Sequence, residues 1–222
     1  MDAMIVLISV FAIFLPALIL PGPDFVAVVR SAMTKGISAG LLTTCGVAIG
    51  LGFYATLSLL GLSAILTEYQ WLAWMVRVLG GSYLVILGIR LLFSKPEQLN
   101  VEIADQEDEP DTLSGPIRRS YGNPLMFGFF VTLTNPKAIV LFASVFATAV
   151  TTETPGWVMG LMVVLVIASA LAWYSIVSLF MASAPVIRRF SKARHRIEQM
   201  AGVCFVAIGG RILADSRNPV TP

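Results

Sequence analysis

Two charged side chains interrupt stretches of this sequence that are otherwise apolar. Asp24 follows a Pro-Gly-Pro break in "LILPGPDFVAVV", and Lys137 follows an Asn-Pro break in "TNPKAIVLF". They are the only carboxylate and the only lysine that lie well inside an apolar stretch. A charge in apolar surroundings costs at least about 2.5–3.5 kcal/mol, so such charges are generally retained for function. A buried carboxylate can hold an ammonium group or a proton, and a buried lysine can hold a carboxylate.

Each break has the sequence of a helix start. In the second, Asn135 is expected to cap the helix and Pro136 to take the first helical position. In the first, Pro23 takes that position and Gly22 supplies backbone freedom. Helix N-termini carry partial positive charge and attract anions. The predicted substrate-binding residues, grouped at two half-helix N-termini that point into one bundle, are therefore Gly22, Pro23, Asp24, Asn135, Pro136 and Lys137.

Two structural interpretations of the breaks compete with a binding site. Prolines kink transmembrane helices without further function. Asp24 and Lys137 could also form an ion pair with each other that only holds the fold together. The sequence leaves a direct pair between them open.

The composition is that of a membrane protein. Of the 222 residues, 57% are hydrophobic and only 13% are charged, about half the usual share of charged residues in soluble domains. Stretches of about 20 apolar residues are long enough to cross a bilayer. The sequence predicts an all-α protein with six spans, at residues 3–29, 37–66, 72–93, 125–150, 157–184 and 200–214.

Basic residues cluster in every second connection. Of the 15 Lys and Arg, 11 lie in or beside the connections near residues 30–35, 90–119 and 188–196. Cytoplasmic loops carry this excess, so both termini are predicted to be periplasmic in a multi-pass inner-membrane protein. The basic cluster at 188–196 is interpreted as an anchor to anionic lipid, and nucleic-acid binding is not expected. Residues 94–122, with seven of the 13 acids, are interpreted as a cytoplasmic linker.

The linker divides the chain into similar halves, residues 1–93 and 123–222. "GSYLVILGIRLL" matches "GVCFVAIGGRIL", "FYATLSLL" matches "WYSIVSLF", and the two breaks match each other. An odd number of spans in each half gives the second half the opposite orientation, as in many secondary transporters. The sequence therefore predicts a 3+3 inverted repeat, with the paired positions Asp24/Lys137, Tyr54/Tyr174, Gly81/Gly202 and Gly88/Gly209. The pairs Gly36/Gly40, Gly46/Gly50 and Gly156/Gly160 are expected to let helices approach closely.

The motifs "LPGPDFVAVVRSAMTKGISAG", "GVAIGLG", "GGSYLVILGIRLL" and "TNPKA" resemble the lysine exporter superfamily, in its homoserine/threonine-efflux branch. They span nearly the whole chain in the order of that family. The resemblance implies a six-helix inner-membrane exporter of amino acids, driven by proton exchange. It implies no enzymatic activity, cofactor or metal, and it leaves open a homo-oligomer.

A neutral amino acid has one ammonium and one carboxylate, for which Asp24 and Lys137 supply one partner each. A cationic side chain would need a second buried acid, so small neutral amino acids such as threonine or homoserine are the expected substrates. Asp24 is also the predicted proton-coupling residue, because it can hold either a proton or the substrate ammonium. The alternative is a thiol–disulfide electron carrier, which would require Cys45 and Cys204 to pair.

The predicted topology is testable by labelling. Single cysteines placed near residues 68 and 153, in a chain with Cys45 and Cys204 replaced by serine, should react with an impermeant reagent added from the periplasm. Cysteines at residues 95 and 192 should not react. The reverse pattern would overturn the orientation.

Overall fold

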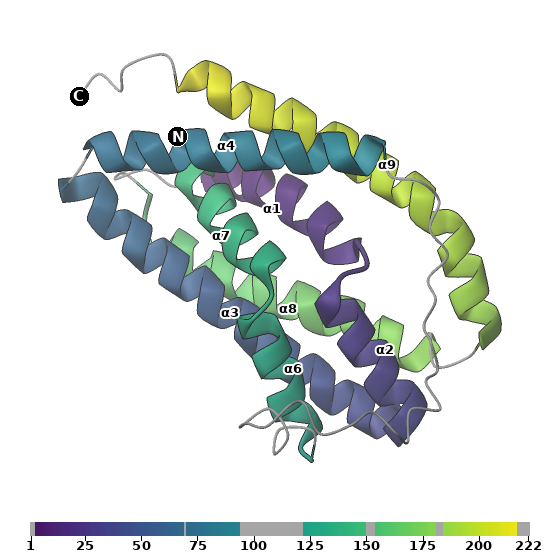
Figure 1. The fold of residues 1–222 in the computed structure, drawn as a ribbon. Coiled ribbons are helices and arrows are strands. Elements are labelled where there is room, and N and C mark those ends of the chain that lie inside the picture. The colour runs from purple at the N-terminus through teal and green to yellow at the C-terminus, as the bar shows by residue number, and fades with distance from the viewer. Residues whose placement is uncertain (1–2, 69, 94–121, 150–153, 181–183, 217–222) are drawn as a thin grey trace, which may run out of the picture.

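The structure is a computed structural model that describes residues 3–68, 70–93, 122–149, 154–180 and 184–216. These residues form helices and contain no strand, which confirms the predicted all-helical fold. Figure 1 shows them as one bundle of helices, several of which cross at steep angles. The helices are α1 (Ala3–Ile19), α2 (Pro23–Lys35), α3 (Ile37–Glu68), α4 (Gln70–Leu92), α6 (Pro124–Leu133), α7 (Pro136–Ala149), α8 (Gly156–Phe180) and α9 (Ala184–Asp215).

The first and fourth predicted stretches are each divided into two helices by their proline motifs. Pro23 begins α2, and the axis bends by 46° between α1 and α2. Pro136 begins α7, directly after the two-residue break that ends α6. A proline is accommodated at a helix start because its missing N–H would have no intrahelical partner there. Both breaks lie in the middle of the bundle rather than at its ends (Figure 1).

The last helix is longer than the sequence predicted. The expected span began at residue 200, whereas α9 begins at Ala184 and includes the basic cluster 188–196. Hydropathy marks where a helix stops being apolar, but arginine, lysine and alanine favour the helix as strongly as leucine does. The predicted connection is therefore helical.

Three helices contain stretches that are long and apolar enough to cross a membrane. The bent pair α1–α2 makes a fourth if it is taken as one span, and shorter apolar stretches occur at Val78–Leu92 and Pro124–Leu133. Large apolar side chains are also exposed, among them Leu57 on α3 and Val164 on α8, at 56% and 60%. A helix surface of this kind suits contact with lipid. The three stretches lie at Ile37–Gly61, Gly156–Phe180 and His195–Ala214.

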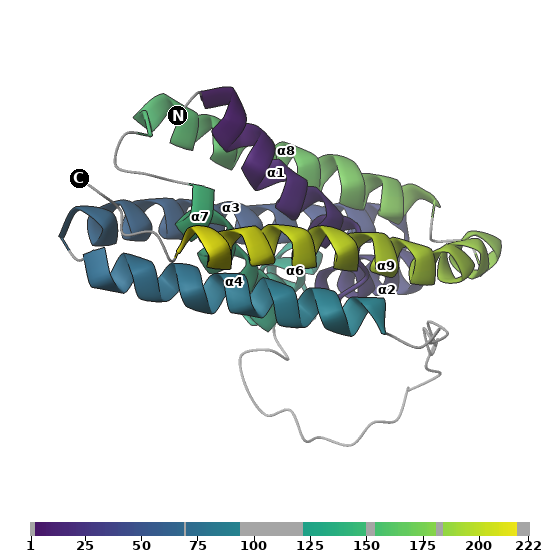
Figure 2. The same cartoon turned by 90° about the horizontal axis from the view of Figure 1, so that it is seen from above.

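Helices α4 and α9 pack side by side through glycines that face each other (Figures 1 and 2). A Cβ added at Gly88 would lie 2.7 Å from the Gly202 carbonyl oxygen, and one at Gly202 would lie 2.8 Å from the Gly88 oxygen. A Cβ at Gly209 would lie 2.8 Å from the Gly81 oxygen. Any side chain at these positions would push the two helices apart. The contact therefore pairs Gly88 with Gly202 and Gly81 with Gly209.

Helix α6 lies against α3 through a second set of small residues. A methyl group at Gly46 would collide with the Leu125 carbonyl, and one at Gly128 would collide with the Thr43 carbonyl. Backbones can approach this closely only where both helices lack a Cβ at the crossing. A Cβ at Gly50 would lie 2.8 Å from the Thr132 Cβ, so the close packing extends to the last turn of α6, which carries part of the site described below.

The expectation of close approach was wrong for three other glycines. Gly36 ends α2 with φ 88°, a left-handed conformation that favours glycine, and no atom of the described residues lies within 4 Å of the position of its Cβ. Gly156 and Gly160, at the start of α8, likewise have no neighbour within 4 Å in the part of the chain that the structure describes. Spacing alone does not distinguish a glycine at a helix crossing from one at a helix end.

Gly128→Val should destabilise the protein, because the added side chain meets the α3 backbone. Overpacking of this kind costs about 1–3 kcal/mol, which lowers the melting temperature by roughly 2–10 °C in a chain of this size. Thermal unfolding of the purified protein measures the shift. Gly160→Val makes the same change in open space and is the control, and equal shifts in the two variants would contradict the packing described here.

Candidate functional site

The Asp24 carboxylate lies in the first turn of α2 and is held by residues of the other break. Its side chain is buried, with 6% of the residue exposed. Oδ1 accepts a hydrogen bond of 3.0 Å from the Thr132 hydroxyl, in the last turn of α6. Oδ2 accepts one of 3.1 Å from the Asn135 amide, between α6 and α7. Two donors and the positive end of α2 thus surround the buried charge.

Asn135 connects the helix start to this carboxylate. Its side-chain oxygen accepts a hydrogen bond of 3.0 Å from the Lys137 backbone N–H, which confirms the predicted N-cap. Because only the amide oxygen can accept that bond, the NH₂ group faces Asp24. One buried side chain therefore caps α7 and donates to the acid at the start of α2.

The Lys137 side chain reaches from α7 to the C-terminal end of α1. Its ammonium donates hydrogen bonds to the backbone oxygens of Ala17, at 2.7 Å, and Leu20, at 3.2 Å. Carbonyls at a helix C-terminus lack intrahelical partners and carry partial negative charge, so a cation is stabilised there. The ammonium passes beside Gly22, 3.6 Å from where a Cβ would stand. Its hydrogen bonds go to these carbonyls and not to the Asp24 carboxylate.

The two breaks therefore hold each other by exchange of partners. Asp24 of the first break is bound by side chains of the second, and Lys137 of the second is bound by carbonyls of the first. All six predicted site residues lie at this junction. Pro23 and Pro136 take the first helical position of α2 and α7, as expected.

A tyrosine of α3 hydrogen-bonds the backbone at the second break. The Tyr54 hydroxyl donates a hydrogen bond of 2.6 Å to the carbonyl of Leu133, the last residue of α6. Sequence reasoning did not place Tyr54 or Thr132 in the site. The only signal for Tyr54 was its match to Tyr174 in the other half, and nothing in the sequence distinguished Thr132 from the other hydroxyl residues of the spans.

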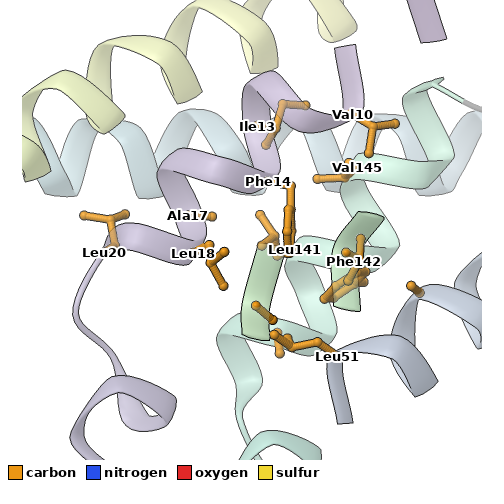
Figure 3. Packing of buried hydrophobic residues seen from close by; sticks show 14 of the residues in the cluster. Val10, Ile13, Phe14, Ala17, Leu18, Leu20, Leu51, Leu141, Phe142 and Val145 are labelled. Atoms are coloured by element: carbon orange, nitrogen blue, oxygen red, sulfur yellow. The ribbon is translucent and has the colours of Figure 1, made fainter. Parts of the chain in front are cut away.

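A small cavity lies between the breaks and the apolar core. Its polar wall contains Asp24, Asn135, Lys137 and Tyr174. Its volume is about 20 Å³, which is room for one water molecule. Figure 3 shows part of the apolar wall, with Phe14 of α1 beside Leu141 of α7. The apolar wall residues are Phe14, Ala17, Leu18, Leu51, Ala138 and Leu141.

The two cysteines lie on different helices. Both are free thiols, with Cys45 half-buried on α3 and Cys204 exposed on α9. Neither lines the cavity. No observation in the described residues therefore favours the electron-carrier alternative.

A protein family described as LysE type translocator matches residues 15–216, which is most of the chain. The chain belongs to this family. The match confirms the resemblance found in the sequence motifs. Members of the LysE family are transporters and not enzymes. The family assignment and the long apolar helices together make the chain a membrane transport protein.

Three relatives match the chain nearly end to end. The threonine efflux protein of Escherichia coli K12 is 28% identical over 202 residues, which cover 91% of this chain and 94% of the relative. That of Salmonella typhimurium is 27% identical over 206 residues, 93% and 96% of the two chains. An uncharacterized membrane protein of Haemophilus influenzae is 26% identical over 214 residues, 96% and 99%. No solved structure gives a significant match.

The double role of Asn135 predicts a larger effect than loss of a helix cap. Asn123 caps α6 in the same way, by a 3.0 Å bond from the Leu125 N–H, but it is exposed and touches no buried charge. Asn123→Ala should cost about 1 kcal/mol, roughly 2–4 °C in melting temperature. Asn135→Ala also removes a donor from a buried carboxylate, which adds about 1.5–3 kcal/mol. Equal shifts in thermal unfolding would show that the bond to Asp24 contributes nothing.

Proposed function

We propose that the chain exports small neutral amino acids from the cytoplasm, with Asp24 binding the substrate ammonium and Lys137 its carboxylate. The observation that carries the proposal is the position of these opposite charges at one cavity, each attached to a helix break. Transporters bind substrates where interrupted helices expose backbone groups to a cavity. Relatives described as threonine efflux proteins cover more than nine-tenths of the chain and support the substrate class.

The contacts at the site suit a substrate that replaces them. Asp24 is bound by two neutral donors, and Lys137 by two neutral carbonyls. Separation of a buried ion pair is costly because it leaves an uncompensated charge. Here a zwitterion need only replace neutral partners with charged ones. The cavity of about 20 Å³ is too small for an amino acid, so the residues around it must move apart to admit one.

The charge balance of the cavity favours neutral amino acids. Asp24 is the only acid in its wall. A lysine or arginine substrate would bring a second cation and find no second carboxylate, and a buried unpaired charge costs several kcal/mol. A neutral side chain fits the rest of the wall, which is apolar apart from Asn135 and Tyr174.

Competition for Asp24 supplies a mechanism for coupling to protons. The carboxylate can hold a proton or the substrate ammonium, but not both. Suppose that the protein switches between inward-open and outward-open forms only when Asp24 holds either a proton or the substrate. Each amino acid that leaves the cell is then exchanged for a proton that enters it.

An inverted repeat would provide the two open states. Gly81 and Gly88 of the first half align with Gly202 and Gly209 of the second. The observed contacts, Gly88 with Gly202 and Gly81 with Gly209, exchange with each other when the halves are exchanged. The two breaks also bind each other in both directions, although the individual hydrogen bonds do not correspond residue by residue. These observations support a 3+3 repeat of six spans, in which one half moves against the other around a fixed site.

Asp24→Asn should abolish transport driven by a proton gradient, because an amide can neither carry a proton nor attract an ammonium strongly. The measurement is accumulation of labelled threonine in inverted membrane vesicles with an imposed proton gradient. Glu198→Gln is the control, since Glu198 is a buried acid of α9 outside the cavity. Uphill transport by the Asp24→Asn protein would reject the coupling mechanism.

Lys137→Ala should chiefly weaken substrate affinity. Loss of a charge-assisted hydrogen bond costs about 1.5–3 kcal/mol, a factor of roughly 10 to 150 in the KM for threonine counterflow. An unchanged KM would show that the substrate carboxylate binds elsewhere.

A further inference from the structure

Tyr174 is a buried polar residue of the cavity that the mechanism above does not use. It lies on α8, 4% exposed, and forms part of the cavity wall with Asp24 and Lys137. Its hydroxyl forms no hydrogen bond with another described residue. The hydroxyl is not one of the fully buried unpaired atoms, which among the described residues are those of Trp173 and His195. A tyrosine hydroxyl that lines a cavity without a protein partner is available to a water molecule or to a ligand group.

Tyr54 provides the internal comparison. The two tyrosines occupy matching positions in the two halves of the sequence. The Tyr54 hydroxyl donates a hydrogen bond to the Leu133 carbonyl at the end of α6. The corresponding carbonyl at the end of α1 is that of Leu20, and it accepts a hydrogen bond from the Lys137 ammonium instead. Lys137 thus occupies the acceptor that Tyr174 would use, and the hydroxyl is left for another group.

The other polar groups of the cavity are already assigned. Both polar atoms of the Asn135 side chain are used, one by the Lys137 N–H and one by Asp24. Asp24 and Lys137 match the ammonium and carboxylate that every amino acid carries. Tyr174 is therefore the one polar group left for the part of the substrate that differs between amino acids, and the rest of the wall is apolar.

We propose that the Tyr174 hydroxyl hydrogen-bonds a hydroxyl group on the substrate side chain and so selects hydroxy amino acids over aliphatic ones of the same size. This inference rests on the proposed function. An aliphatic side chain would displace the water that fits the cavity and leave the tyrosine hydroxyl buried without a partner. A site built to bind a substrate hydroxyl rejects the analogue that lacks it far more strongly than an apolar pocket discriminates by size.

Threonine and valine test the proposal because they differ by a hydroxyl in place of a methyl group. In proteoliposomes with the full-length protein, the KM for counterflow of threonine should be at least about tenfold lower than that for valine. In Tyr174→Phe the difference should fall to about threefold or less, through a higher KM for threonine with the value for valine unchanged or lower. A wild-type protein that prefers valine overturns the proposal without any variant.

Tyr54→Phe is the matched control. It removes the same atom from the paired tyrosine, whose bond goes to the protein, so it should change threonine and valine transport by the same factor. If Tyr174→Phe also changes both by one factor, or neither, the hydroxyl does not contact the side chain and the proposal is wrong. A wild-type protein that moves no amino acid of a labelled panel would instead refute the proposed function itself.

Discussion

A buried carboxylate in an apolar bundle is the constraint on which the site depends. Asp24 cannot remain charged there without donors, and its own helix supplies only the partial charge of its N-terminus. The donors come from the other half of the chain, Thr132 and Asn135. The Lys137 ammonium needs acceptors in the same way, and the carbonyls at the end of α1 supply them. Each break thus supplies the hydrogen-bond partners of the charged side chain in the other.

The helix contacts far from the charges serve this requirement. Gly46, Gly50 and Gly128 let α6 approach α3 closely along its length, with Gly50 against Thr132 in the last turn of α6. The glycines between α4 and α9 hold these two helices close together. Small residues determine how closely the helices approach, and that spacing determines whether a hydroxyl and an amide reach the Asp24 oxygens at about 3 Å.

The sequence predicted those residues of the candidate site that are unusual within an apolar helix. Asp24, Lys137 and the prolines stood out because charges and helix breaks are costly in apolar stretches, and Asn135 followed from capping. Thr132 and Tyr54 could not be found in this way. A hydroxyl residue costs little free energy in a span, and its hydrogen-bond partner depends on tertiary packing. The length of α9 was underestimated because hydropathy reports the surroundings of a helix and not its ends. The glycine pairs were interpreted correctly only where a second helix crosses them.

The size of the cavity limits how a proton could move through it. The cavity has room for one water molecule, and the charged groups beside it are bound to protein atoms. A file of several waters, along which a proton could pass from one polar group to the next, does not fit in that volume. Within the cavity a proton could therefore move only by way of a side chain such as the Asp24 carboxylate.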